Sequence, residues 1–233
     1  MFYPFIWGFD PTIVILFPAI IFTLYAQGKV KSNFTKYLNV PTIRNYTGYE
    51  VAKRLLDEQG LFNIPIEMTK GYLSDHYDPR KRVLRLSEAV YQGTSIASVS
   101  VASHEVGHAI QHAKGYIPLK IRNSIFPIAS FGSSAAWLFI IIGLIIPELG
   151  GLMDIGILLF GAAVFFQVIT LPVEFNASNR AINLLIGNGF IIDKEIVGSK
   201  KVLGAAALTY VAAMATGIAQ LFRLLLIRNS RRR

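Results

Sequence analysis

The sequence contains no cysteine among its 233 residues. Disulfide bonds and thiolate metal sites are therefore excluded, and any bound metal must use nitrogen and oxygen ligands. Charged residues are also scarce, at 16% against about 25% in an ordinary soluble domain, whereas 53% of the residues are hydrophobic. This balance is typical of a membrane protein with one modest polar portion.

Four long apolar runs are candidates for crossing a bilayer, whose apolar core needs about 20 helical residues. The first ends near Gln27 and lacks the basic start and cleavage site of a signal peptide, so we interpret it as a membrane anchor. The second (125–146) and the third (about 155–173) flank a short turn that carries Glu148 and Asp154. The fourth (202–222) is uncharged and rich in small residues, and it either spans or packs against the other helices.

The sequence therefore predicts a mainly α, multi-pass membrane protein with 3–4 membrane helices and a small α+β polar portion. Five segments are expected: an N-terminal anchor (1–27), a polar portion with short edge strands (28–122), a membrane hairpin (123–173), a helix with a basic loop (174–201), and an apolar helix with a basic tail (202–233). Within the polar portion, Thr47 and Glu50 predict a capped helix, and short strands turn at "DPRK". A second helix is expected from about Ser87 onward.

The formal charge of +9 comes from basic residues that cluster beside the apolar runs. This distribution is typical of membrane flanks and argues against a nucleic-acid partner. The polar portion has 14 Lys and Arg against 8 Asp and Glu, so we expect it to face the cytoplasm, with the Glu148–Asp154 turn outside. The tail has five arginines, and we expect it on the cytoplasmic side too, with the fourth run only partly inserted.

The stretch "HEVGH" is a match to H-E-x-x-H, formed by His104, Glu105 and His108. On an α-helix, residues four apart face the same way, so the two imidazoles can bind one zinc ion while Glu105 reaches a water molecule. The motif also arises by chance on exposed helices. Here its surroundings are apolar on most sides, and burying these polar groups without a metal would be costly, which favours a metal site.

The third ligand must come from elsewhere in the chain. His112 lies about 12 Å along the helix from His104, too far for one ion to bind both, so we interpret it as a neighbour that supports the site. Glu174 directly follows the third apolar run and is the strongest candidate, although it could instead cap a helix beside Arg180. Two histidines, one glutamate and a water form an established catalytic zinc set.

Three stretches together resemble the YugP family of bacterial membrane zinc metallopeptidases: "DHYDPRKRVLRLSEAVY", "SIASVSVASHEVGHAIQHAKGY" and "LPVEFNAS". The family is similar in arrangement to HtpX-type and CAAX prenyl membrane peptidases, whose E-x-x-A-D motif supplies the third ligand. The resemblance implies a zincin-like, gluzincin-type portion in which His104, His108 and Glu174 bind one zinc ion and Glu105 is the catalytic base. Ser178 stands where those relatives have aspartate.

The resemblance also places "GYLSDHYDPR" at the edge strand along the substrate cleft. By analogy, His76 or Tyr77 could stabilise the oxyanion, although His76 could equally pair with a neighbouring aspartate in a turn. Arg180 is a third candidate, although a lone arginine near a membrane boundary more often meets lipid headgroups.

The function expected is a membrane-bound zinc endopeptidase that hydrolyses peptides or membrane proteins beside the cytoplasmic face of the cell membrane. The alternative is a membrane protein with a structural zinc site that acts in binding or assembly, which would need a fourth protein ligand from His112 or His76. A metal transporter is disfavoured, because the apolar runs are nearly free of His, Asp and Glu.

Overall fold

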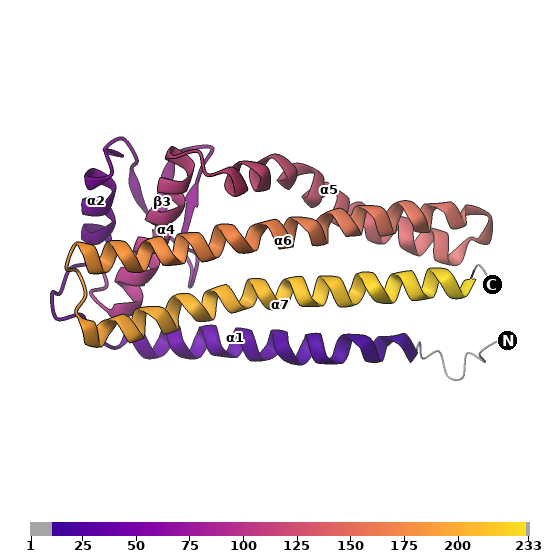
Figure 1. The fold of residues 1–233 in the computed structure, drawn as a ribbon, viewed down its shortest axis with the longest axis horizontal. Helices are drawn as coiled ribbons and strands as arrows, with labels where there is room; N and C mark the ends of the chain where they lie inside the picture. The colour runs from indigo at the N-terminus through magenta and orange to yellow at the C-terminus, as the bar shows by residue number, and fades with distance from the viewer. Residues whose placement is uncertain (1–10, 232–233) are drawn as a thin grey trace. The chain divides into compact units, whose positions relative to one another are not determined.

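The structure is a computed structural model that describes residues 11–231; residues 1–10 of the expected anchor and Arg232 and Arg233 of the tail lie outside the described residues. In chain order, the elements (Figure 1) are η2 (Pro11–Leu16), α1 (Phe17–Leu38), α2 (Gly48–Glu58), β1 (Ile66–Thr69), β2 (His76–Asp78), β3 (Val83–Ser87), α3 (Glu88–Tyr91), α4 (Ile96–Ala113), α5 (Ile117–Ile145), η3 (Pro147–Leu149), α6 (Gly150–Gly187) and α7 (Asp193–Arg231).

The chain forms two compact units. The helical unit comprises Met1–Tyr25, Arg122–Ile169 and Tyr210–Arg233, and the sheet unit comprises Ala26–Ile121 and Thr170–Thr209. The histidine motif and Glu174 both belong to the sheet unit.

The predicted capped helix is α2. Thr47 accepts a hydrogen bond from the backbone of Glu50, and the Glu50 side chain accepts one from the backbone of Thr47, which completes a capping box. Val51, Leu55 and Leu56 are fully buried on one face of this helix. They pack in one core with residues of β3 and α4.

The three short strands form one sheet in the order β1-β3-β2, so β2 is an edge strand. β1 runs parallel to β3, and β2 runs antiparallel to β3 with Tyr77 opposite Leu84. The predicted turn at "DPRK" connects β2 and β3, and Asp78 Oδ1 accepts hydrogen bonds from the backbone of Arg80 (2.9 Å) and Lys81 (3.1 Å). These bonds fold the backbone into a tight turn.

The helix expected from Ser87 is in fact two helices, α3 and α4. The break lies at Gly93, where an added Cβ would lie 2.2 Å from the carbonyl oxygen of Ala89 and 2.4 Å from Ser98 Oγ. Ser95 then starts α4 by accepting a hydrogen bond from the backbone of Ser98 (3.0 Å). A capping serine two residues after this crowded glycine restarts the helix in a new direction.

The long helices extend beyond the apolar runs that predicted them. α1 runs through the segment end expected at residue 27, α5 through 122, α6 through 173 and α7 through 201. The helices therefore continue across these four expected segment boundaries. Apolar composition marks only the part of a helix that suits lipid, whereas backbone hydrogen bonding continues into polar sequence.

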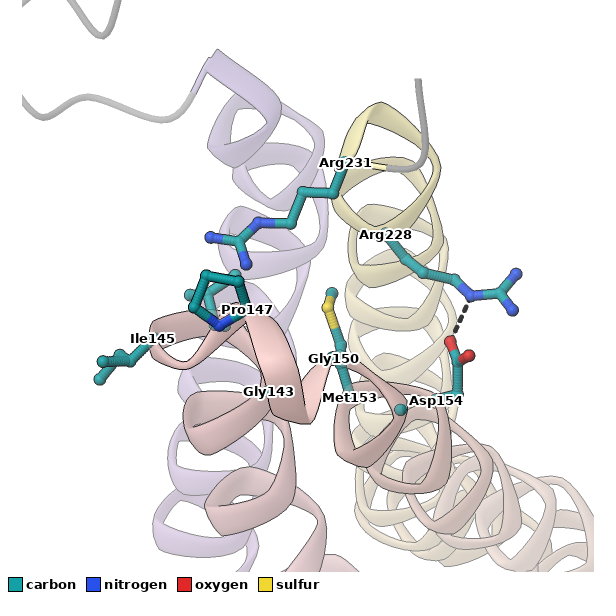
Figure 2. Close-up of a pocket in the computed structure, with 10 residues that line it drawn as sticks. Gly143, Ile145, Pro147, Gly150, Met153, Asp154, Arg228 and Arg231 are labelled. Atoms are coloured by element: carbon teal, nitrogen blue, oxygen red, sulfur yellow. Dashed lines mark hydrogen bonds and ion pairs between the residues drawn. The ribbon is translucent and has the colours of Figure 1, made fainter.

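The end of α7 pairs with the start of α6 in the helical unit. Arg228 Nε donates to Asp154 in a close ion pair (Figure 2), and a cavity of about 570 Å³ there is lined by the α5–α6 turn, Arg228 and Arg231. An ion pair cannot join groups on opposite sides of a bilayer. The expectation of a cytoplasmic tail combined with an outer Glu148–Asp154 turn is therefore wrong.

Four helical stretches are long and apolar enough to cross a membrane: Pro11–Leu38, Ile117–Ile145, Pro147–Gly187 and Asp193–Arg231. In the apolar window of each, only 11–33% of the residues are buried by protein. Exposed apolar surface on this scale is typical of a membrane environment, and the fourth stretch is a candidate for crossing it by the same criteria as the other three.

Candidate metal centre

Helix α4 carries the H-E-x-x-H motif through the interior of the sheet unit. Thirteen of its residues are buried, from Ile96 to Gln111. Glu105 is only 8% exposed, and the His104 and His108 side chains are each 12% exposed. The helical spacing brings the two imidazole rings to a centroid separation of 4.7 Å, so the motif has the geometry that its spacing predicted.

Helix α6 passes close enough to α4 for their backbones to touch. A Cβ added at Gly107 would lie 2.8 Å from the carbonyl oxygen of Ala177. Glycine on α4 opposite alanine on α6 therefore allows the approach. The residues of α6 that share one helical face on this side, Glu174, Ala177, Ser178 and Ala181, are all buried.

The Glu174 carboxylate meets both imidazoles. Its Oε2 lies 3.4 Å from His104 Nε2 and 3.5 Å from His108 Nε2, and the two Nε2 atoms lie 3.1 Å apart. Ligand atoms about 2.0–2.1 Å from a tetrahedral zinc ion lie about 3.3 Å from one another. The observed separations fit zinc, and within the described residues this is the one group of three or more potential ligands close enough for a single metal ion.

Each imidazole has a partner at its other ring nitrogen. Ser178 Oγ lies 3.2 Å from His104 Nδ1, and Gln111 Oε1 lies 3.0 Å from His108 Nδ1. Such partners fix the ring orientation of metal-binding histidines. Although Ser178 stands where related peptidases have aspartate, its hydroxyl still contacts the second ring nitrogen of His104.

Glu105 contacts the edge strand. Its Oε2 accepts a hydrogen bond from the backbone N–H of Tyr77 (3.0 Å), which places β2 beside the motif helix. The loop before β2 is held by Asp75, whose carboxylate accepts hydrogen bonds from the backbone (2.6 Å) and hydroxyl (3.2 Å) of Ser87. Burial raises the pKa of Asp75, and the nearby Glu105 charge adds to this effect, against the opposing Ser87 hydrogen bonds.

His112 points to Tyr77 and has no place among the three converging ligand atoms. Its Nδ1 lies 2.9 Å from the Tyr77 hydroxyl. Burial, and then the positive charge of Arg82, lowers the pKa of His112, and burial raises the pKa of Tyr77. Both side chains are therefore neutral near pH 7, and either one can donate in this hydrogen bond, depending on the tautomer of His112.

The remaining candidates from the sequence have other partners. His76 is exposed, and its Nδ1 lies 2.8 Å from the carbonyl oxygen of Ser74. Arg180 donates from Nε to Asn176 Oδ1 (2.7 Å) and so packs along α6. The two alternatives left open by the sequence, pairing of His76 with a neighbouring aspartate and a capping Glu174 beside Arg180, are not among these contacts.

Comparison with known proteins assigns a family to this arrangement. Residues 12–229 match the family described as "Putative neutral zinc metallopeptidase". The chain is 52% identical over 205 residues to "Putative membrane protease YugP" of Bacillus subtilis (strain 168), covering 88% of this chain and 91% of that protein. No solved structure matches the chain.

The chain belongs to the neutral zinc metallopeptidase family. Membership agrees with the His104, His108 and Glu174 cluster, whose atoms could bind a metal ion, and with the four apolar helices of a membrane protein.

One buried residue that contacts this cluster was not predicted from the sequence. Gln111 is fully buried and bridges His108 to α6. The available signal was a glutamine one helical turn after the second histidine in an otherwise apolar helix. The adjacent His112 was considered as a zinc ligand, because histidine is a common metal ligand and glutamine is not.

Proposed function

We propose that this protein is a membrane-bound zinc endopeptidase in which His104, His108 and Glu174 hold the metal and Glu105 is the general base. The observation that carries the proposal is the convergence of two Nε2 atoms and one carboxylate oxygen at separations of 3.1–3.5 Å. When bound, zinc supplies a Lewis acid that polarises a peptide carbonyl and makes a water molecule acidic.

Glu105 is placed to move the proton. Its Oε2 is engaged by the Tyr77 backbone, so we assign proton transfer to Oε1. The carboxylate takes a proton from the attacking water and delivers it to the nitrogen of the leaving amine. The fixed hydrogen bond from the strand keeps the carboxylate in one orientation through both transfers.

Strand β2 is the proposed support for the substrate backbone. It is one of the two edge strands of the sheet, and an edge strand can hold an extended peptide by backbone hydrogen bonds. Of the three candidates for stabilising the oxyanion, we favour Tyr77, because its backbone N–H bonds to Glu105. When His112 donates from Nδ1, the Tyr77 hydroxyl accepts that bond and keeps its own proton for the substrate.

A purely structural zinc site is not favoured. Closed structural sites use four protein ligands, whereas His104, His108 and Glu174 converge here without His112 or His76. The Nδ1 atoms of His112 and His76 bond to Tyr77 and Ser74 instead. A buried glutamate held beside the ligands is needed for hydrolysis and has no part in a structural site.

The proposed location is the cytoplasmic face of the cell membrane. Eighteen of the 23 Lys and Arg residues lie between Lys29 and Lys201, in the polar sequence that joins the apolar stretches on the site's side of the chain and in the ends of the flanking helices. The positive-inside rule assigns that side to the cytoplasm. Membrane proteins or peptides near the inner leaflet are the substrates that this location would offer.

Metal removal and replacement test the proposal. Protein purified in detergent should bind one zinc ion per chain and cleave a mixed peptide library. A strong chelator should abolish cleavage, and added zinc should restore it to the wild type but not to His108→Ala. Cleavage that survives complete zinc removal would contradict the proposal.

A further inference from the structure

Gln111 makes contacts in two directions from the interior of the sheet unit. Its side chain is fully buried. Oε1 lies 3.0 Å from His108 Nδ1, while Nε2 donates to the carbonyl oxygen of Val173 (2.8 Å) and to Asn176 Oδ1 (3.0 Å). One amide therefore connects the imidazole of His108, a proposed ligand on α4, with the backbone and a side chain of α6.

The partners determine which way the amide faces. The Val173 carbonyl can only accept a hydrogen bond, so it must meet the NH₂ group, and the amide oxygen must then face His108. An oxygen at that position accepts, which requires His108 to carry its proton on Nδ1. The lone pair is then on Nε2, the atom that lies 3.5 Å from Glu174 Oε2.

The same amide also bears on the third carboxylate. Val173 directly precedes Glu174 in the chain, so the Gln111–Val173 hydrogen bond fixes the height at which α6 presents Glu174 to the histidines. Asn176, the second acceptor, is itself held by Arg180 Nε (2.7 Å). These contacts link His108 through Gln111 and Asn176 to Arg180, which lies one turn further along the same face of α6.

We propose that Gln111 is a positioning residue of the metal centre, which selects the metal-binding tautomer of His108 and sets the register of Glu174 against α4. The inference rests on the zinc site of the proposed function. Partners of this kind typically change metal affinity by about 10–100-fold when they are removed.

Gln111→Leu tests the proposal by removing both halves of the contact at similar volume. Zinc affinity is measured by competition with a chromophoric chelator, and we expect a loss of about 10–100-fold. Pulsed electron paramagnetic resonance of the Cu²⁺-loaded protein should show that one of the two remote imidazole nitrogens has lost its hydrogen bond. Gln220→Leu, the same change at a buried glutamine of α7, should alter neither measurement.

Gln111→Glu keeps an oxygen for His108 but loses the donor to α6. This variant should keep the electron paramagnetic resonance signal of a hydrogen-bonded remote imidazole nitrogen but bind zinc at least tenfold more weakly. If Gln111→Leu does not fold, the zinc affinity of Gln111→Glu tests the proposal instead. Zinc affinity within twofold of wild type in a folded variant would overturn the proposal. Failure of the wild type itself to bind zinc would instead contradict the proposed function.

Discussion

Tyr77 contacts the proposed machinery through two different groups. Its backbone N–H is bonded to Glu105 and its hydroxyl to His112. The backbone contact survives any side-chain change, so the hydroxyl can be tested separately from the placement of Glu105.

Removing the hydroxyl with Tyr77→Phe should lower kcat by about 100-fold, the usual cost of losing one oxyanion donor. KM and zinc content should change little, because neither the ligands nor the strand backbone is altered. Tyr72→Phe is the matched control, since that hydroxyl bonds to Thr35 (3.0 Å). Equal kcat values for the two variants would exclude Tyr77 from the transition state.

Asp75 links pH to stability. Burial, and then the charge of Glu105, raises the pKa of Asp75 in the folded state. The stabilisation of the folded state by protonated Asp75 is therefore fully present below the unfolded pKa of about 3.9. It is lost as the pH rises through the folded pKa. Asp75→Asn does not titrate there. The difference in Tm between wild type and Asp75→Asn should therefore move in favour of the wild type as the pH falls from 7 toward 4.5. A difference that is constant over this range would contradict the assignment.

For individual residues, the sequence predicted those contacts that depend on spacing along one helix. His104 and His108 face one another because they are four residues apart on a helix, and Glu174 stood out as a carboxylate at the end of an apolar run. The role of Gln111 was not predictable in the same way. Its partners Val173 and Asn176 lie on another helix, and only the three-dimensional register between helices brings them together.

Helices α4 and α6 form the site because their backbones approach closely at one point. Gly107 and Ala177 are in near contact, and the three proposed ligands lie within one turn of this crossing. The distance between the helices therefore controls the distances between the ligands.

Gly107→Ala should force the two helices apart. Overpacking of this kind typically costs about 1–3 kcal/mol, and zinc affinity should fall with it as Glu174 moves away from the imidazoles. Gly204→Ala on α7 is the control, because an added Cβ there meets nothing within 4 Å, and alanine is favoured over glycine in a helix by about 1 kcal/mol. Thermal unfolding and zinc titration of both variants provide the comparison, and an unchanged zinc affinity in Gly107→Ala would contradict this view of the crossing.

The elements themselves were predictable to different extents. The capping box at Thr47 and Glu50 and the turn at Asp78 involve residues within three positions of one another, and both are present. The full lengths of the long helices could not be predicted from the apolar runs, because hydropathy reports the environment of a segment rather than its backbone hydrogen bonds. Glu174 consequently lies on the same helix as the third apolar run rather than on a separate one.

At the scale of the whole molecule, the Arg228–Asp154 ion pair determines the membrane topology of the helical unit. It brings the C-terminal end of α7 to the α5–α6 turn, and Arg223 Nε bonds to Thr12 (3.3 Å) near the start of the first apolar stretch. These three parts of the chain therefore share one membrane face. Counting charges along the sequence did not reveal this, because the five arginines of the tail favour the cytoplasmic side when they are considered alone.

Single cysteines test this topology cleanly, since the chain has none of its own. With a membrane-impermeant maleimide applied to intact cells, Gly151→Cys and Ser230→Cys should both be labelled, whereas Lys81→Cys should be labelled only after lysis. The cysteine-free wild type gives the background. Labelling of Ser230→Cys and Gly151→Cys from opposite sides would contradict the shared face.

The variant Glu105→Gln tests most directly whether Glu105 is the general base of a zinc peptidase. Wild type and variant are purified in detergent, loaded with zinc and incubated with the same peptide library. The account predicts one zinc ion per chain in both proteins and a loss of cleavage of at least about 100-fold in the variant. Equal cleavage by two proteins with equal zinc content would contradict it.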